Sequence, residues 1–441
     1  MVKKTSENSY DVVIVGSSLA GILAAQRLTR KGQKVLLLEA SDQYGKTLAT
    51  VNWQGLAVVG DVAALSAFPE DQAILEQWSE ELNKQDFQLS FSLRPNEFVT
   101  DLQQELKPFL GFGDHAPEFY HCIDELLNGQ RLGLVPVLSE VMTWLLEQIP
   151  HKQTLAEVSK IYTAGEGATM SLAGLQINSA KDFFCDQIFW LESPRTLLPL
   201  LPQAMISQKQ RTRWTKRELW AKVGLDLFYK SAVLNSEQSM VLLGSHRDDA
   251  QPVIGQCWSG AELKAAGKVP APEDEIVDVS NFPSSSAGGS DDPMQLAASE
   301  TTESDGQLWR WQAYLSEDLA DEPENVNEVL KRMRRMIKKQ MPLEEAVERI
   351  VVWPASAGHF ESKEGEWISA LSPQLKLGHS SLRARQGLAS EIIAAQKILE
   401  SLELTPAPKR RGKKEAEHHS TLSGEAETPS LAPETTSDLT L

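Results

Sequence analysis

The hydrophobic pattern near the start of the chain predicts a strand, a helix and a second strand. Residues 11–15 form a short β-branched run, which is typical of a strand buried on both faces. From residue 19 to residue 30 apolar side chains recur at helical spacing, and Gly32 ends the pattern. Residues 35–38 form a second apolar run, which ends at Glu39. The pattern therefore predicts a right-handed βαβ unit with two parallel strands.

The rest of the chain predicts further helices, a few strands and two segments of low complexity. Trp309 and Trp311 alternate with Arg310, so we expect the two indoles to share one sheet face, more as core than as cavity lining. Residues 268–306 are rich in Pro, Ser, Gly and acidic residues, which predicts a disordered insertion, and a disordered tail is expected from 405 to 441. Helices are predicted at about 73–84, 118–127, 136–149, 324–339 and 384–402, and strands at 225–229, 240–243 and 308–315.

The turn between the first strand and the first helix has the residues of a dinucleotide-binding loop. Gly16 permits a tight turn, and Ser18 is a small residue where the backbone must approach a pyrophosphate. Gly21 lets the helix lie close to the strands, and the first amides of the helix would face the phosphates. Glu39 is placed to accept hydrogen bonds from ribose hydroxyls. The predicted cofactor contacts in this unit are Gly16, Ser17, Ser18, Gly21, Glu39 and Ala40.

The segment after Glu39 resembles the start of the flavin-containing amine oxidase superfamily, which includes phytoene desaturases and protoporphyrinogen oxidases. In that family a strand-end Glu-Ala precedes Arg-x-x-x-Gly-Gly-Arg and a hairpin, and residues 55–60 resemble a shortened hairpin. Ser41 stands where the family has Arg, and Lys46 and Thr47 stand where it has Gly-Arg. Lys46 would either crowd the flavin or offer a phosphate the charge of the missing arginine. The resemblance implies that Gly45 and Lys46 contact FAD.

A second match lies near the end of the chain. Residues 375–379 and 386–395 are similar to the family's closing segment, in which a strand ends in Gly-Asp or Gly-Glu beside the flavin and a helix starts under the isoalloxazine ring. His379 replaces the acid; it can donate to a phosphate but cannot act as a carboxylate acceptor. The resemblance implies that Gly378, His379 and Gly387 also contact the cofactor.

The resemblance implies an α/β fold, with an FAD/NAD(P)-binding doubly wound parallel sheet and a second, helix-rich substrate domain interleaved in sequence. Residues 10–66, 195–267 and 351–404 are assigned to the FAD-binding domain. Residues 67–194 and 307–350 are assigned to the substrate domain, 268–306 to the disordered acidic insertion and 405–441 to the disordered tail.

Composition narrows the function classes. The 441 residues include 43 Lys and Arg and 61 Asp and Glu, and the resulting charge of -18 disfavours nucleic-acid binding. Three widely spaced cysteines predict neither a disulfide framework nor a metal site. The apolar stretch 12–25 is broken at Gly16 and is too short to span a membrane, so we expect a cytoplasmic protein without a transmembrane segment.

Two functions follow from the resemblance. The first is an FAD-dependent oxidoreductase of the amine oxidase and desaturase type, which transfers a hydride from an unknown small-molecule substrate to the flavin. The second is a non-catalytic relative with a degraded flavin site that acts as a binding protein, as Rab GDP-dissociation inhibitors do. The turn at residues 42–45 resembles both groups equally well. An NAD(P)-binding protein is a third alternative, and no catalytic residue can be named from the sequence.

Overall fold

The fold is taken from a computed structural model of the chain. All the described residues lie in one compact unit, residues 1–404. The predicted tail at 405–441 lies outside them, as does the predicted insertion except for Gly306. The structure describes residues 8–46, 50–53, 56–59, 65–102, 105–164, 171–216, 219–234, 238–244, 251–259, 306–358, 370–372, 374–379 and 387–403.

The first sheet has a parallel centre and antiparallel flanks. Strands β10, β2, β1 and β13 lie side by side in that order, and β20 also pairs with β13; all these pairs are parallel. The antiparallel pairs are β13 with β12, β12 with β11, and β20 with β19. This sheet confirms the predicted α/β class. Its strands are β1 (Ser9–Val15), β2 (Val35–Leu38), β10 (Lys152–Gln153), β11 (Val158–Ala164), β12 (Ser171–Ile177), β13 (Lys181–Trp190), β19 (Ala370–Ser372) and β20 (Leu375–Leu377).

The second sheet is almost entirely antiparallel. Its order is β18-β14-β17-β16-β15-β7-β8, and only β15 and β7 pair in parallel. Its strands are β7 (Glu97–Leu102), β8 (Glu105–Pro108), β14 (Leu219–Tyr229), β15 (Gln238–Leu242), β16 (Val253–Ser259), β17 (Gln307–Ser316) and β18 (Val347–Gly358). Two smaller sheets contain β3 (Thr50–Trp53) with β4 (Leu56–Val59), and β5 (Ser66–Ala67), β9 (Gln130–Val135) and β6 (Ser90–Arg94).

The helices arise where apolar residues recur at three- and four-residue spacing. Ser18 caps the first of them, because its hydroxyl accepts a hydrogen bond from the amide of Gly21. None of the helices in the described ranges is long and apolar enough to cross a membrane. The helices are α1 (Leu19–Arg30), α2 (Gln72–Asn83), α3 (Tyr120–Asn128), α4 (Leu138–Glu147), α5 (Pro194–Leu197), α6 (Gln208–Thr215), α8 (Glu317–Ala320), α9 (Pro323–Ile337) and α10 (Leu388–Glu403), with short 3-10 turns at Pro69–Asp71, Gly113–His115, Leu198–Leu200, Gln203–Met205 and Leu343–Glu345.

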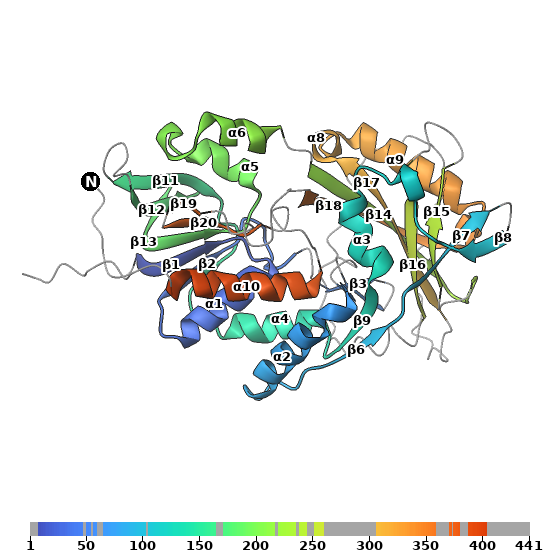
Figure 1. Ribbon diagram of the computed structural model, residues 1–441, viewed down its shortest axis with the longest axis horizontal. Helices are drawn as coiled ribbons and strands as arrows, with labels where there is room; N and C mark the ends of the chain where they lie inside the picture. The colour runs from blue at the N-terminus through green and yellow to red at the C-terminus, as the bar shows by residue number, and fades with distance from the viewer. Residues whose placement is uncertain are drawn as a thin grey trace, which may run out of the picture. The chain divides into compact units, whose positions relative to one another are not determined.

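Helices cover both faces of each sheet (Figure 1). On the first sheet, α1, α2, α4 and α10 pack on one face, and α5 and α6 on the other. On the second sheet, α9 packs on the face that carries Trp309 and Trp311, which confirms that these indoles share one face and belong to the core. Helix α3 packs against part of the opposite face.

Most predicted helices are confirmed, but the sequence pattern missed many strands. Strands β11, β12 and β13 fall within the segment assigned to a helix-rich substrate domain, yet they extend the first sheet. Conversely, β14, β15 and β16 fall within the segment assigned to the FAD-binding domain, yet they belong to the second sheet. The second sheet also takes strands from the segments assigned to the substrate domain, so those segments are less helical than expected. The physical reason is that strand pairing over long sequence distances leaves no local signal of which sheet a strand joins.

Candidate functional site

The carboxyl ends of four parallel strands meet at one edge of the first sheet. Val15 of β1 lies in register with Leu38 of β2 and Trp190 of β13, and Trp190 lies in register with Leu377 of β20. The ladder continues one residue further, because the amides of Gly16 and Gly378 donate to the carbonyls of Leu38 and Trp190 at 2.8 and 3.0 Å. The predicted site segments at 16–21, 39–40 and 378–379 therefore lie at one edge, where open α/β sheets bind their ligands.

The two glycines of the turn occupy positions at which a side chain would be strained or would clash. Gly16 adopts a φ of +99°, which disfavours any side chain. A Cβ on Gly21 would lie 2.5 Å from the carbonyl oxygen of Gly16 and 2.8 Å from Cδ1 of Leu191. Glycine at position 21 thus lets α1 approach the strands closely, as the fingerprint requires.

Glu39 organises the loop at the end of β2. Its Oε2 atom accepts hydrogen bonds from the amide of Ser17, at 3.1 Å, and from the Ser17 hydroxyl. Its Oε1 atom accepts from the amide of Ser41 at 2.8 Å. The Ser17 oxygen in turn accepts a hydrogen bond from the amide of Gly45 at 2.8 Å. The network joins the β1–α1 turn to the β2 loop and keeps the half-buried Glu39 carboxylate at the sheet edge.

A second carboxylate contacts the amino end of α1. The amide of Ala20 donates to Oε2 of Glu391, in the first turn of α10, at 2.8 Å. Glu391 is buried, and α10 packs along α1. One of the amides that a phosphate would use is therefore already bound by a protein carboxylate. Sequence reasoning missed Glu391, since nothing local links it to a residue 371 positions earlier.

Glu192 is a further acidic residue at this edge. It follows β13, and burial together with the negative charge of Glu39 raises its pKa to about 7. A Cβ on Gly16 would lie 3.1 Å from both the amide nitrogen and Oε1 of Glu192, so this residue lies directly against the turn. With its pKa raised, this carboxyl group holds a proton at higher pH than an ordinary glutamate, and the protonated form can donate a hydrogen bond. In the sequence, Glu192 can be found as an acid that directly follows an apolar run, as Glu39 does.

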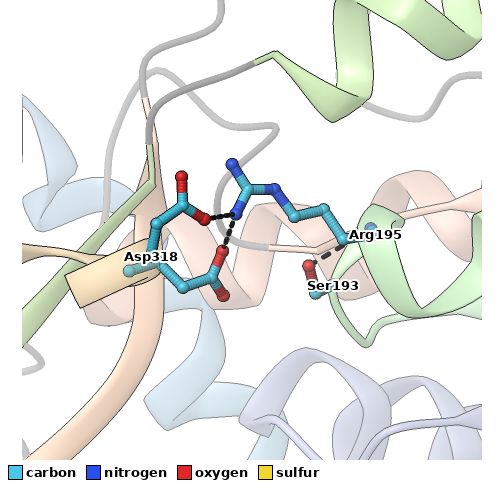
Figure 2. Close-up of polar contacts among 4 residues, drawn as sticks. Ser193, Arg195 and Asp318 are labelled. Atoms are coloured by element: carbon cyan, nitrogen blue, oxygen red, sulfur yellow. Dashed lines mark hydrogen bonds and ion pairs between the residues drawn. The ribbon is translucent and has the colours of Figure 1, made fainter. Parts of the chain in front are cut away.

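The chain that follows Glu192 connects the site with the second sheet. Ser193 caps α5, since its hydroxyl accepts from the amide of Arg195 at 3.3 Å. Figure 2 shows the Arg195 guanidinium directed at Asp318, one of the two acids that begin α8. Its Nη1 lies 2.5 Å from Glu317 Oε2 and 3.0 Å from Asp318 Oδ1. Because α8 follows β17 directly, this ion pair joins the carboxyl edge of the first sheet to the second sheet.

The glycines predicted to approach the flavin contact protein atoms. Gly45 has a φ of +59°, and a Cβ there would overlap Cε of Met142 in α4. A Cβ on Gly387 would overlap the carboxylate of Glu125 in α3, and the amide of Gly387 donates to Oε2 of Glu125 at 2.8 Å. A Cβ on Gly378 would overlap the side chain of Leu191. Close contacts with Met142, Glu125 and Leu191 therefore account for glycine at these positions.

The remaining predicted site residues occupy less enclosed positions. Ala40 and Lys46 are exposed, and the ammonium of Lys46 pairs with Asp42 at 3.2 Å, which with the hydrogen bond lowers the pKa of Asp42. His379 is half-buried next to Gly378. No cluster of His, Cys, Asp or Glu suited to a metal ion occurs in the described ranges, and Cys122, Cys185 and Cys257 are buried thiols.

The donors and acceptors at this edge fit the ADP half of a dinucleotide. The tight Gly16 turn, the capped amino end of α1 and the strand-end Glu39 occupy the positions that the fingerprint gives them. The protonated fraction of Glu192 adds a hydrogen-bond donor beside the turn. Glu39 is an acceptor of the kind that ribose hydroxyls need, and the amino end of α1 offers donors of the kind that a phosphate needs.

Comparison with known proteins agrees with this geometry. Residues 14–80 match the family model of the NAD(P)-binding Rossmann-like domain. No curated protein sequence matches the chain.

Solved structures share the fold at low sequence identity. An oxidoreductase from Methanosarcina mazei is 11% identical, with a TM-score of 0.59 over 88% of this chain and 100% of that one. A protein assigned as a protoporphyrinogen oxidase from Exiguobacterium sp. 255-15 is 13% identical, with a TM-score of 0.57 over 91% and 100%. Putrescine oxidase bound to putrescine is 14% identical, with a TM-score of 0.52 over 90% and 99%. The chain thus contains an NAD(P)-binding Rossmann-like domain and has the fold of these oxidoreductase structures.

Proposed function

We propose that the chain binds FAD and acts as an oxidoreductase on a small molecule. The observation that carries this proposal is the convergence of Gly16, Glu39 and Gly378 at the carboxyl edge of a parallel sheet. The shared fold with an amine oxidase and with a protein assigned as a protoporphyrinogen oxidase supports it. We further propose that the first sheet serves the cofactor and the second sheet serves the substrate.

Each group at the edge has a role in this proposal. Glu39 accepts hydrogen bonds from the ribose, while the amino end of α1 and the protonated Glu192 donate to the pyrophosphate. Gly45, Lys46, Gly378, His379 and Gly387 are the proposed contacts of the flavin half. When bound, the flavin would supply the chemistry by accepting a hydride from a C–H or N–H bond of the substrate. The protein's part is to orient the substrate and to exclude water.

A specific observation favours a second candidate, the non-catalytic binding protein. Gly45 and Gly387 lie against Met142 and Glu125, and Glu391 occupies the Ala20 amide at the amino end of α1. Each of these contacts replaces one that a flavin would be expected to make in the first candidate. The two candidates differ in whether the chain retains a flavin.

Titration with FAD distinguishes the two candidates. Quenching of flavin fluorescence gives a dissociation constant for the purified chain, and the flavin absorbance after dialysis reports retention. We expect tight FAD binding, which Glu39→Gln should weaken by roughly tenfold or more because the amide loses the charge that binds ribose hydroxyls. Gly16→Val should abolish binding, since the turn needs a positive φ.

The matched control is Glu157→Gln, which changes an exposed acid. It should leave FAD binding as in the parent chain. If the parent chain, folded by circular dichroism, binds neither FAD nor its ADP half, the oxidoreductase proposal is wrong and the binding-protein alternative is favoured. Binding of ADP without binding of FAD would contradict only the proposed contacts of the flavin half.

A further inference from the structure

The amides of the turn between β1 and α1 are largely bound by nearby groups of the chain. The Ser17 amide donates to the Glu39 carboxylate at 3.1 Å, and the Gly21 amide donates to the Ser18 hydroxyl at 3.5 Å. Both acceptors belong to the βαβ unit or to the loop that follows it. Contacts of this kind form within one short stretch of sequence and close the turn.

The Ala20 amide differs, because its acceptor is a charged side chain from the far end of the sequence. It donates to Oε2 of Glu391 at 2.8 Å, across 371 positions. Ala20 is the second residue of α1, and the first hydrogen bond of the helix runs from the Ile22 amide to the Ser18 carbonyl at 3.0 Å. The Ala20 amide therefore has no partner within the helix and lies at the positive end of the helix dipole. Glu391 places a protein anion at the helix end where the fingerprint places a pyrophosphate.

The contact between Glu391 and Ala20 is enclosed by protein. Ala20 is 0% exposed and Glu391 is 8% exposed. Helix α10 lies along α1 (Figure 1), and Ile392 and Ala395 of α10 belong to the apolar cluster that also contains Leu23 of α1. A hydrogen bond from an N–H to a carboxylate is stronger where water is excluded. The carboxylate therefore holds this amide more firmly than an exposed side chain would.

The acids near this helix end add to the competition with a phosphate. Glu39 accepts from the Ser17 amide of the same turn, and Glu192 lies against Gly16. A phosphate oxygen and the Glu391 carboxylate could share one N–H only by coming into contact. Two negative groups at such short range repel each other strongly inside a protein, where the effective dielectric constant is below that of water. A phosphate therefore reaches the Ala20 amide only when Glu391 leaves it.

We propose that Glu391 is a specificity-determining residue of the dinucleotide site and competes within the molecule with the pyrophosphate of the ligand. Its carboxylate holds the Ala20 amide, and an incoming pyrophosphate must displace it. The affinity for phosphate-bearing ligands is reduced by the fraction of molecules in which the amide is available, whereas the affinity for the nucleoside half is not. The inference rests on the proposed dinucleotide site, but it concerns the phosphate contact alone.

A competing residue differs from a structural residue in a measurable way. Removing a structural contact loosens the fold and weakens the binding of every ligand that the fold positions. Removing the Glu391 carboxylate also weakens a hydrogen bond in the ligand-free protein, but it strengthens the binding of the anion with which the carboxylate competes. The stability of the ligand-free protein and its affinity for a phosphate-bearing ligand should therefore change in opposite directions.

Glu391→Gln is the principal variant, because glutamine keeps an acceptor for the Ala20 amide and loses the charge. Isothermal titration calorimetry of the full chain with ADP and with adenosine measures the two affinities. We expect ADP to bind the variant roughly tenfold more tightly than it binds the parent chain, and adenosine to gain nothing. The ligand-free variant should melt at a lower temperature than the parent, and added ADP should raise its melting temperature by more. Glu391→Ala, which frees the amide, should strengthen ADP binding at least as much.

The matched control is Glu400→Gln, which removes the same charge from an exposed position of α10. It should leave both the ADP affinity and the melting temperature as in the parent. The inference is overturned if Glu391→Gln and Glu391→Ala bind ADP no more tightly than the parent, including the case in which none of these chains binds ADP. It is also overturned if adenosine gains as much as ADP, or if both substitutions prevent folding as judged by circular dichroism.

Failure of the proposed function gives a different result. A parent chain that does not bind FAD, with Glu391 variants that bind ADP more tightly, would contradict the oxidoreductase proposal and support the role of Glu391. A parent chain that binds FAD, with Glu391 variants of unchanged ADP affinity, would overturn the role of Glu391 alone.

Discussion

The carboxyl edge of the first sheet and a buried polar strip of the second sheet both gather charged groups, but they are built from different parts of the chain. The polar strip lies on the face opposite α9 and consists of Lys222, Asp226, Gln256, Arg310 and Gln312. At the edge, backbone amides of Ser17 and Ala20 donate to the carboxylates of Glu39 and Glu391. In the strip, side chains of central strands face one another, as Arg310 and Asp226 do. Neighbouring parallel strands end at the same edge of a sheet, so the turns that follow them lie together. In the antiparallel sheet, the groups that meet are side chains on one face of paired strands.

This difference has a consequence for function and stability. Backbone donors at the edge are positioned by turns, so glycine substitutions should affect them most. Side chains in the strip are positioned by register and burial, so charge and amide substitutions should affect them most. Glycine substitutions at the edge and charge substitutions in the strip therefore test this difference.

The largest effect is expected from Asp226→Asn in the strip. Asp226 is fully buried, accepts two hydrogen bonds from Arg310, and lies 3.8 Å from the Arg349 guanidinium. Removing its charge leaves buried guanidinium groups without their counter-ion, which should cost about 3–5 kcal/mol of unfolding free energy. Urea denaturation measures the loss. Glu348→Gln, which breaks a half-exposed pair with Arg334 on the same sheet, should cost no more than about 1 kcal/mol. Equal losses in the two variants would contradict this account.

The next effect is expected from Gly21→Val at the edge. The added Cβ would meet the Gly16 carbonyl oxygen at 2.5 Å, and a strand-facing helix cannot move without disturbing Leu191. We expect a loss of about 3 kcal/mol, measured by urea denaturation. Gly32→Ala is the comparison, because Gly32 has a φ of +81° and open space around it. Backbone strain alone should cost it about 1 kcal/mol, and an equal or larger loss there would show that the close contact with the Gly16 carbonyl and Leu191 is not the cause.

A smaller, pH-dependent effect is expected from Glu192. Its pKa is raised from an ordinary value near 4.5 to about 7 by burial and by Glu39, so the folded chain binds more protons than the unfolded chain between these values. This group therefore lowers stability as pH rises from about 4.5 to about 7. Glu192→Gln should stabilise the protein by on the order of 2 kcal/mol at about pH 8 and hardly at about pH 5. A gain of the same size at both pH values would refute the assignment.

The smallest effect is expected from the ion pair between α5 and α8. Arg195 is partly buried between Glu317 and Asp318, and the pKa of Glu317 is raised, chiefly by burial, in spite of the opposing charge of Arg195 (Figure 2). Arg195→Gln should cost about 0.5–1 kcal/mol of unfolding free energy, because such pairs are partly screened by solvent. The loss should shrink at high salt. A loss that does not respond to salt would mean that the Arg195 stem contributes through packing.

Much of the carboxyl edge could be predicted from the sequence. The glycines at 16 and 21 and the acid at 39 stand close together in a strand–helix–strand unit, so their roles follow from local geometry. Glu125 and Glu391 could not be predicted in this way, because each contacts a backbone amide far away in the sequence and a buried acid on a helix has the same sequence pattern as an exposed one. Glu192 follows an apolar run as Glu39 does, but only the tertiary structure places it against the Gly16 turn.

The sequence by itself determined the βαβ unit, the turn residues and the apolar faces of the helices, because these depend on neighbours within a few positions. Only the tertiary structure decided which sheet β11 to β16 join, and hence which polar residues meet. Gln256 and Gln312 share a face because β16 and β17 pair across the long segment between them, and register alone fixes that meeting. Alternation in each strand predicts an inward side chain, but the partner opposite it is set by long-range pairing.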